Sequence, residues 1–212
     1  MHMEAQLLAR IHALLSTRDR VIVGIAGPPA AGKSTLARAL VAHLRAQEIA
    51  AAYLPMDGYH LSNAELQRLG RLDRKGAPDT FDADGYRALL ARLRRDPAQT
   101  VYAPDFNRAL EEPIAGSIAI GPEVSVIVTE GNYLLLDAAP WPEARRSLDE
   151  VWYLAIPGDV RRQRLVVRQE AGGKDRASAE AWADGSDARN AALVETSRDG
   201  ADLVIEGTVV VS

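Results

Sequence analysis

The stretch VIVGIAGPPAAGKST, residues 21–35, decides the fold. Its first six residues, Val21–Ala26, are apolar and mostly β-branched, which is typical of a buried strand. The next eight, Gly27–Ser34, fit the pattern G-x-x-x-x-G-K-[ST]. A helical pattern then runs from Lys33 to about Gln47. A strand, a glycine-rich turn and a helix in this order are the context that the pattern requires, so the segment predicts a phosphate-binding loop.

This loop predicts how a triphosphate is held. Its glycines let the backbone approach the phosphates closely, and the amides at the helix N-terminus favour an anion. Lys33 is expected to neutralise the β- and γ-phosphates, and the Ser34 hydroxyl to hold Mg²⁺. The residues expected to bind the nucleotide are Gly27, Pro28, Pro29, Ala30, Ala31, Gly32, Lys33, Ser34 and Thr35.

Strand-like and helix-like segments alternate along the rest of the chain. Strands are expected at 49–54, 100–106, 116–120, 124–129, 151–156, 203–206 and 208–211. Helices are expected at 61–69, 84–95, 159–169 and 177–197, the last broken near Gly185, with a loop at 71–82. This alternation predicts an α/β fold, a parallel sheet with helices on both faces. Ligands bind at the carboxyl ends of such strands, where Gly27, Asp57, Glu130 and Pro157 fall.

Length and composition bound the class of protein. The chain has 212 residues, 47% hydrophobic and 25% charged, so we expect a globular domain with an appendage. A net charge of −4 argues against a dedicated nucleic-acid binder. There is no apolar run of the length that a membrane span needs, so no membrane partner is expected. The absence of cysteine excludes disulfides and thiolate chemistry and fits a cytoplasmic location.

Asp57 follows the strand expected at 49–54, within the sequence LPMDGYH, residues 54–60. A carboxylate at this place can face the γ-phosphate, where transfer to an alcohol needs a group that orients the hydroxyl and accepts its proton. The alternative is a turn or helix-capping aspartate before Gly58. For Tyr59 and His60 the sequence likewise allows two roles, contact with a ligand or ordinary packing.

Several further motifs follow the phosphate-binding loop in a fixed order. They are DGYH (57–60), KGAPDTFD (75–82), TEGNY (129–133) and the RxxR pair of Arg161 and Arg164. Together they resemble the uridine kinase, phosphoribulokinase and pantothenate kinase superfamily. The bacterial branch labelled fructose transport system kinase, or nucleoside/nucleotide kinase family, is the most similar pattern. The resemblance covers about residues 21–206.

The resemblance implies one P-loop NTPase domain over residues 1–212. Its parts would be an N-terminal helix in residues 1–18, a small acceptor-binding insertion at about 58–120 and a lid region at about 159–190. It also implies ATP as the phosphoryl donor.

Roles for the acidic residues follow from the same resemblance. Asp57 matches the catalytic base of these kinases, and Glu130 matches an acidic residue near Mg²⁺ or the acceptor. The strand at 124–129 lacks the usual acidic metal ligand. The metal ligands are therefore expected among Ser34, Asp57 and Glu130, with the second protein ligand either Asp57 or Glu130.

Arginines of the expected lid are implied to close over the phosphates. Arg161 and Arg164 match lid arginines, and Arg168 and Lys174 extend that role. The three arginines are spaced to share one helical face, which is equally typical of a solvated basic surface. Cations on a mobile segment would neutralise transition-state charge and exclude water. The residues expected to act in catalysis are Asp57, Lys33, Arg161 and Arg164.

The acceptor pocket is expected to be built from the insertion and the strand ends. Arg108 either binds the acceptor or pairs with Glu111 or Glu112 along the chain. Gly76 and Asn107 depart from the uridine kinase pattern, which argues against a pyrimidine nucleoside. The residues expected to bind the acceptor are Tyr59, His60, Lys75, Asp79, Arg108, Glu130 and Tyr133.

Asp187 and Asn190 resemble an S-D-x-x-N element of the same branch, and we expect them to cap and pack a helix rather than to take part in chemistry.

The function implied is an ATP-dependent kinase that moves the γ-phosphoryl group of Mg-ATP to a hydroxyl of a sugar, a nucleoside or a similar metabolite. The alternatives are a nucleoside-monophosphate kinase and a regulatory P-loop ATPase without an alcohol acceptor. The chain has no N-K-x-D and no L-S-G-G-Q, which argues against a GTPase and a transport ATPase. The protein is expected to act as a monomer or homodimer.

Overall fold

The run Val21–Ala26 forms the central strand β1, and all six of its residues are buried. The computed structural model describes residues 2–207. In it, β1 pairs in parallel with β5 (Val126–Gly131) on one side and with β6 (Glu150–Ala155) on the other. A strand covered on both faces needs an apolar run rather than an alternating pattern, which explains why these segments could be predicted.

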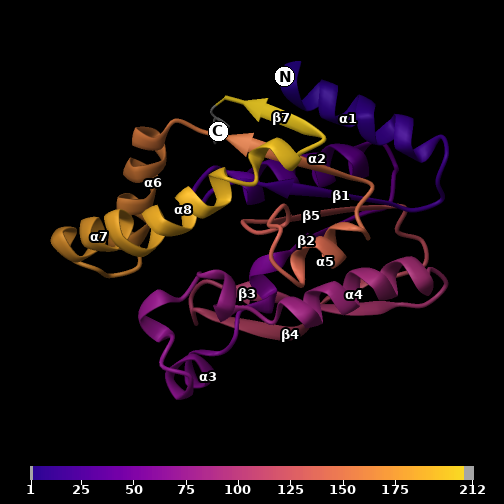
Figure 1. Cartoon of the computed structure of the whole chain (residues 1–212). Coiled ribbons are helices and arrows are strands. Elements are labelled where there is room, and N and C mark those ends of the chain that lie inside the picture. The colour runs from indigo at the N-terminus through magenta and orange to yellow at the C-terminus, as the bar shows by residue number, and fades with distance from the viewer. Residues whose placement is uncertain (1, 208–212) are drawn as a thin grey trace.

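Two more parallel strands complete the sheet. β2 (Ala51–Pro55) pairs with β5, and β7 (Leu203–Glu206) pairs with β6, which gives the order β2-β5-β1-β6-β7 (Figure 1). The carboxyl ends of all five strands therefore lie at one edge of the sheet. The predicted α/β fold with a parallel sheet is confirmed.

Helices cover both faces of this sheet. On one face, α1 (His2–Leu15) and α2 (Lys33–Ala46) pack their leucines against every second residue of β1. On the opposite face, α4 (Ala83–Arg95) and α5 (Trp141–Arg145) join a second cluster that contains Ile22. Burial on both sides is what an amphipathic helix and a fully apolar strand each require, so the two cores support the same arrangement.

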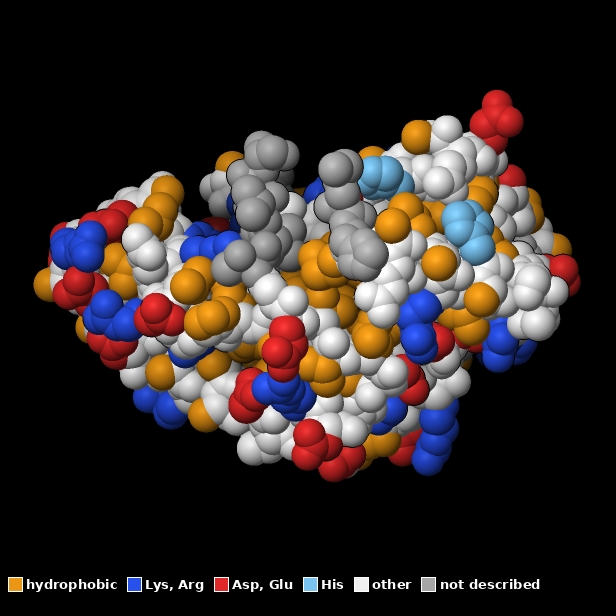
Figure 2. Space-filling model, turned by 90° about the horizontal axis from the view of Figure 1, so that it is seen from above, with side chains coloured by type: hydrophobic (Ala, Val, Ile, Leu, Met, Phe, Trp, Pro, Cys, Tyr) orange, Lys and Arg blue, Asp and Glu red, His pale blue; other side chains and the backbone are white. Residues whose placement is uncertain are grey.

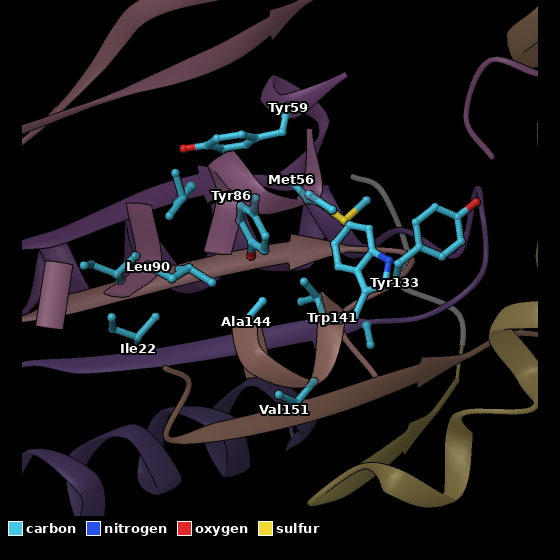
Figure 3. Close-up of a cluster of buried hydrophobic side chains, with 14 of the residues drawn as sticks. Ile22, Met56, Tyr59, Tyr86, Leu90, Tyr133, Trp141, Ala144 and Val151 are labelled. Atoms are coloured by element: carbon cyan, nitrogen blue, oxygen red, sulfur yellow. The ribbon is translucent and has the colours of Figure 1, made fainter. Parts of the chain in front are cut away.

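An aromatic group fixes the turn after β2 against the sheet. Trp141 lies between Tyr86 and Tyr133, with ring centroids 6.4 and 5.6 Å away (Figure 3). Met56 is fully buried beside them, and a Cβ at Gly131 would lie 2.5 Å from its sulfur. Because the turn and the end of β5 pack this closely, the side chain that follows Met56 has a fixed position over the sheet edge.

A hairpin apart from the main sheet forms the insertion. β3 (Val101–Asn107) and β4 (Glu112–Ile120) pair antiparallel, and the short helix α3 (Asn63–Arg68) precedes them in the chain. The hairpin lies against the turn after β2. A Cβ at Gly58 would come within 2.5 Å of the Pro104 carbonyl oxygen, so this contact requires glycine.

Helices that follow β6 form a separate layer at one end of the molecule. α6 (Gly158–Ala171), α7 (Arg176–Trp182) and α8 (Ala188–Glu195) lie together beyond the sheet (Figure 1). Buried side chains of α6 and α7 make a small cluster of their own. This layer therefore has its own packing, in contrast to the helices on the sheet faces.

Several predictions differ from the structure in detail. The interruption expected near Gly185 is present, but it is a π-helical turn, Ala183–Asp187, that joins α7 to α8 rather than a loop. β4 begins at Glu112, earlier than expected, because pairing with β3 carries it past the polar residues. Helix α5 was not predicted: it is one short turn with proline at its start. The predicted loop 71–82 contains two 3₁₀ turns. The strand expected at 208–211 lies outside the described residues.

The surface of the described part carries mixed charge. On the face that Figure 2 shows, Lys and Arg side chains lie among Asp and Glu side chains. Across residues 2–207, none of the helices is both long enough and apolar enough to cross a bilayer. The division of the chain into an N-terminal helix, an insertion and a lid stays a prediction.

Candidate active site

A cavity of about 520 Å³ opens at the carboxyl edge of the sheet. Three parts of the chain line it: the phosphate-binding loop, the turn after β2 together with the insertion, and the layer of α6, α7 and α8. Polar and charged groups that are far apart in the sequence therefore meet in one space. Such a concave site with converging polar groups is typical of small-molecule binding.

The phosphate-binding loop adopts the backbone conformation that its glycines predict. Gly27 has φ +148°, and a Cβ there would lie 2.6 Å from the Leu154 carbonyl oxygen. Gly32 has φ +100° and stands immediately before α2. The free amides of the first turn of α2 therefore face the cavity, where they suit a phosphate group.

Lys33 is buried and its ammonium group is held inside the loop. Its Nζ donates to the carbonyl oxygen of Pro28 at 3.0 Å and to Asn132 Oδ1 at 2.7 Å. Burial lowers the pKa of Lys33 to about 8, against the opposing effect of the Glu130 carboxylate. The cation is therefore poised to gain from an anionic ligand, which would favour its charged form.

Glu130 is the penultimate residue of β5 and lies beside the phosphate-binding loop. Its Oε1 accepts hydrogen bonds from Ser34 Oγ at 3.0 Å and from Tyr53 Oη at 2.7 Å. Burial, reinforced by the nearby Asp57 carboxylate, raises the pKa of Glu130. Burial disfavours the charged form of Glu130, and a nearby cation would stabilise that form. The hydrogen-bonded pair of Ser34 and Glu130 therefore fits Mg²⁺.

Ser34 and Glu130, joined by a hydrogen bond, are the protein groups beside the phosphate-binding loop that could hold a metal. No group of three or more His, Asp or Glu side chains that could hold a metal occurs in residues 2–207. Mg²⁺ usually binds through one or two carboxylates together with substrate phosphates. The Ser34 hydroxyl and the buried Glu130 carboxylate match this mode of Mg²⁺ binding.

Asp57 lies in the 3₁₀ turn Met56–Tyr59 and faces the same cavity. Its Oδ2 accepts a hydrogen bond from Arg108 Nη2 at 2.6 Å. Burial by itself raises the pKa of Asp57, but the surrounding positive charges, led by His60 and Arg108, outweigh it and hold that pKa below its usual value. The carboxylate is thus kept ionised beside the phosphate-binding loop.

The structure contradicts one of the two predictions made for Arg108. Local pairing with Glu111 or Glu112 is wrong, because the guanidinium reaches across to Asp57 instead. It also lies 4.9 Å from the Phe106 ring centre. The hairpin turns this side chain toward the cavity, which a local spacing argument does not reveal.

Other predicted acceptor residues fall into two groups. His60 and Lys75 line the cavity, with the His60 ring packed against Phe81 at 4.0 Å. Three others lie outside the lining. Tyr59 is buried with its hydroxyl unpartnered, Tyr133 donates to the Gly76 carbonyl oxygen, and Asp79 pairs with Arg74 at 2.8 Å. Their roles as acceptor contacts stay predictions.

Of the arginines predicted to form a lid, only some line the cavity. Arg164 and Arg168 line the cavity together with Lys174. Arg161 does not, although its Nη1 is buried without a hydrogen-bond partner. The shared helical face is therefore only partly turned toward the cavity. The catalytic role expected of Arg161 and Arg164 stays a prediction.

Two features of the site were missed or misjudged from the sequence. Tyr53 was not singled out, yet it holds Glu130; a tyrosine inside an otherwise apolar strand is a signal that a polar partner lies nearby. The capping role expected for Asp187 is wrong, because its side chain makes no capping hydrogen bond to α8. Both Asp187 and Asn190 line the cavity.

The chain is similar to known proteins along most of its length. Residues 22–209 match the model of the Phosphoribulokinase / Uridine kinase family. A Schizosaccharomyces pombe protein described as a candidate uridine kinase is 33% identical over 95% of this chain and 89% of its own length. The YggC protein of Escherichia coli is 31% identical over 92% of this chain and 81% of its own.

Solved structures give the same picture. The crystal structure of a candidate fructose transport system kinase from Silicibacter sp. TM1040 superposes with a TM-score of 0.88. It is 40% identical and the match covers 95% of this chain and 98% of that one. D-glycerate 3-kinase from Cryptococcus neoformans, at 14% identity and a TM-score of 0.66 over 99% and 96% of the chains, shares the fold.

Proposed function

The chain belongs to the phosphoribulokinase and uridine kinase family of P-loop kinases, and from this premise we propose that it transfers the γ-phosphoryl group of Mg-ATP to a hydroxyl of a sugar, a nucleoside or a similar metabolite. As a member of this family it is a phosphotransferase with an alcohol acceptor that acts on small metabolites. The observation that carries the finer proposal is that Asp57 and Lys33 face one cavity, with Ser34 and Glu130 hydrogen-bonded beside them.

The donor nucleotide is assigned to the phosphate-binding loop. The amides at the start of α2 bind the phosphate oxygens, and the Lys33 ammonium neutralises the β- and γ-phosphates. Ser34 and Glu130 would hold Mg²⁺, which when bound neutralises charge on the phosphate oxygens. Tyr53 keeps the Glu130 carboxylate oriented toward Ser34.

The acceptor hydroxyl is assigned to Asp57. The oxygen of the acceptor hydroxyl attacks the γ-phosphorus, and the bond between that phosphorus and the β–γ bridging oxygen breaks, which releases ADP. The hydroxyl proton passes to the Asp57 carboxylate. A carboxylate with a lowered pKa is a weak base, but this transfer demands little base strength because the transition state is loose. Arg108 holds one carboxylate oxygen and leaves the other for the hydroxyl.

The cations of α6 are assigned to the transferred group. Arg164 and Arg168 line the cavity from α6, and each would place positive charge near the γ-phosphoryl group. Positive charge that is fixed before the reaction stabilises the transition state more than the ground state.

An ADP-release screen tests the proposal. Mg-ATP is offered with D-fructose, D-ribose, uridine, D-glycerate, pantothenate or a nucleoside monophosphate, to wild type and to Asp57→Asn. We expect one alcohol to stimulate turnover, and Asp57→Asn to lower the stimulated rate by about 10²- to 10⁴-fold with ATP binding retained. The matched control is Asp84→Asn, the same change at an exposed residue paired with Arg87, which is expected to behave as wild type.

Two outcomes would overturn the proposal. Stimulation by a nucleoside monophosphate, with Asp57→Asn as active as wild type, points to a phosphate acceptor, which needs no alcohol base. A slow basal ATP turnover that none of these acceptors raises points to a regulatory ATPase.

A further inference from the structure

Asp187 carries a buried carboxylate oxygen that the fold does not use. The residue is 7% exposed, it lines the cavity, and its Oδ2 has no hydrogen-bond partner. Although Asp187 stands directly before α8, its side chain does not cap that helix. A buried polar group without a partner costs free energy, so its place at a cavity wall points to a ligand.

Asn190 lies one helical turn further along α8 and faces the same space. It is 6% exposed and lines the cavity. Its Nδ2 lies 3.9 Å from the position that a Cβ at Gly76 would occupy, so the absence of a side chain at 76 leaves room in front of the amide. The Gly76 carbonyl oxygen is itself held by the Tyr133 hydroxyl. Asp187 and Asn190, which we call the α8 pair, therefore face the insertion, on the side where the acceptor is assigned.

The chemistry of the α8 pair selects hydroxyl groups. A carboxylate oxygen accepts a hydrogen bond and an amide both donates and accepts, and side chains one turn apart can serve two neighbouring hydroxyls. A carboxylate on the ligand would be repelled by Asp187. An ammonium group would be repelled by Arg168 and Lys174, both of which act on the Asp187 charge.

The aromatic part of the lining suits the carbon skeleton of a polyol. Phe81, Phe106 and Trp182 line the same cavity. Aromatic faces bind the apolar face of a ring, while the few polar groups fix its orientation. A neutral polyhydroxylated molecule presents both kinds of surface, whereas a simple alcohol would leave the α8 pair unsatisfied.

We infer that Asp187 and Asn190 bind two neighbouring hydroxyl groups of a neutral polyhydroxylated acceptor, such as a sugar or the ribose of a nucleoside, and thereby decide which alcohols this kinase phosphorylates. This inference rests on the proposed function, because it concerns the acceptor of the same reaction. The α8 pair does not touch the reacting atoms: Asp57 receives the proton, and the pair binds hydroxyls that are not phosphorylated.

The test compares acceptors that differ by one hydroxyl. Wild type, Asp187→Ala and Asn190→Ala are assayed with D-ribose against 2-deoxy-D-ribose, uridine against 2′-deoxyuridine, D-fructose, and D-glycerate. We expect wild type to prefer a fully hydroxylated neutral acceptor. In Asp187→Ala the KM for that acceptor should rise about 10- to 100-fold, the value of a hydrogen bond to a charged group, and the preference over its deoxy analogue should shrink. The KM for Mg-ATP should stay within about twofold.

The matched control is Asp184→Asn, compared with Asp187→Asn. Asp184 lies in the same π-helical turn but pairs with Arg162 at 2.7 Å and is exposed. Asp184→Asn is expected to leave every KM unchanged. Asp187→Asn keeps an acceptor oxygen and should fall between wild type and Asp187→Ala.

Thermal melting separates a binding role from a structural one. Because Asp187 Oδ2 has no partner to lose, Asp187→Ala without ligand is expected to melt no lower than wild type. A lower melting temperature together with an unchanged acceptor KM would show a structural role and overturn the inference. The inference would also be overturned by a wild-type enzyme that phosphorylates only D-glycerate. The same holds for a wild-type enzyme that phosphorylates the deoxy acceptors as well as their hydroxylated counterparts. A wild type that is stimulated neither by these acceptors nor by pantothenate removes the proposed function itself, a result distinct from those two.

Discussion

The two sides of the cavity are built in different ways. The proposed nucleotide side has a contiguous strand, loop and helix as its frame, in which Lys33 donates to Pro28 five residues away, and only Glu130 and Asn132 join it from a distant segment. The acceptor side is assembled from distant segments: Arg108 meets Asp57 across 51 residues, and Tyr133 meets Gly76 across 57. A site formed by neighbours in the chain keeps its geometry wherever the strand and helix pack. A site formed by distant segments can change its ligand when one segment changes.

The two sides also differ in how completely their polar groups are satisfied. On the nucleotide side, Ser34, Glu130 and Lys33 all have hydrogen-bond partners. On the proposed acceptor side and in the layer of α6, α7 and α8, three buried atoms have no partner: Tyr59 Oη, Arg161 Nη1 and Asp187 Oδ2. A buried polar group without a partner in the protein calls for an explanation, and a bound ligand is one.

The largest effect is expected on the nucleotide side, from Lys33→Met. Removing the buried cation should lower Mg-ATP turnover by about 10³-fold, because no other group of the loop neutralises the phosphates. The pKa of about 8 adds a pH signature. Below it Lys33 is charged and binds phosphate, and as the pH rises through it the free enzyme loses that proton and nucleotide affinity falls.

Titration of a non-hydrolysable ATP analogue from about pH 6.5 to about pH 9.5 measures this dependence. It should be present in wild type and in Asp57→Asn, and absent in Lys33→Met. A wild-type affinity that stays constant over this range would contradict the assignment of Lys33.

A smaller effect is expected on the acceptor side, from Arg108→Gln. Activity requires ionised Asp57, so it is present above the pKa of Asp57 and lost as the pH falls through it. Arg108 is one of the charges that lower that pKa, so without the guanidinium the pKa of Asp57 should rise and the acid limb of the pH–rate profile should move to higher pH. At neutral pH we expect about a tenfold loss in kcat/KM for the acceptor.

The profile is recorded beside Arg87→Gln, which removes an exposed arginine paired with Asp84. That control should reproduce the wild-type profile. An Arg108→Gln enzyme whose acid limb coincides with that of wild type would mean that Arg108 does not hold the charge of Asp57.

The smallest effect is expected from Tyr53→Phe, which tests whether the metal ligand is oriented from a neighbouring strand. The change removes one hydrogen bond to Glu130 and leaves the ring in place beneath Arg38. The apparent KM for Mg²⁺ should rise roughly threefold to tenfold, with the acceptor KM unchanged. An unchanged Mg²⁺ dependence would show that Ser34 alone orients the carboxylate.

Local patterns determined much of this protein. The apolar run at 21–26, the glycines at 27 and 32 and the helix from Lys33 specify a phosphate-binding loop by themselves, because their hydrogen bonds and dihedral angles are set by adjacent residues. The buried strands could be predicted for the same reason. The order of short motifs further indicated the family that the comparisons show.

Tertiary structure alone decided the partners of the acidic residues. Nothing near Asp57 in the chain points to Arg108, and nothing near Glu130 points to Tyr53, because both contacts form only when separate segments meet at the edge of the sheet. The same holds for Asp187, whose position before a helix predicts a cap, but which makes no capping hydrogen bond and lines the cavity instead. Chain neighbours fix where the phosphates bind, whereas the choice of acceptor depends on long-range packing, which short-range periodicity does not encode.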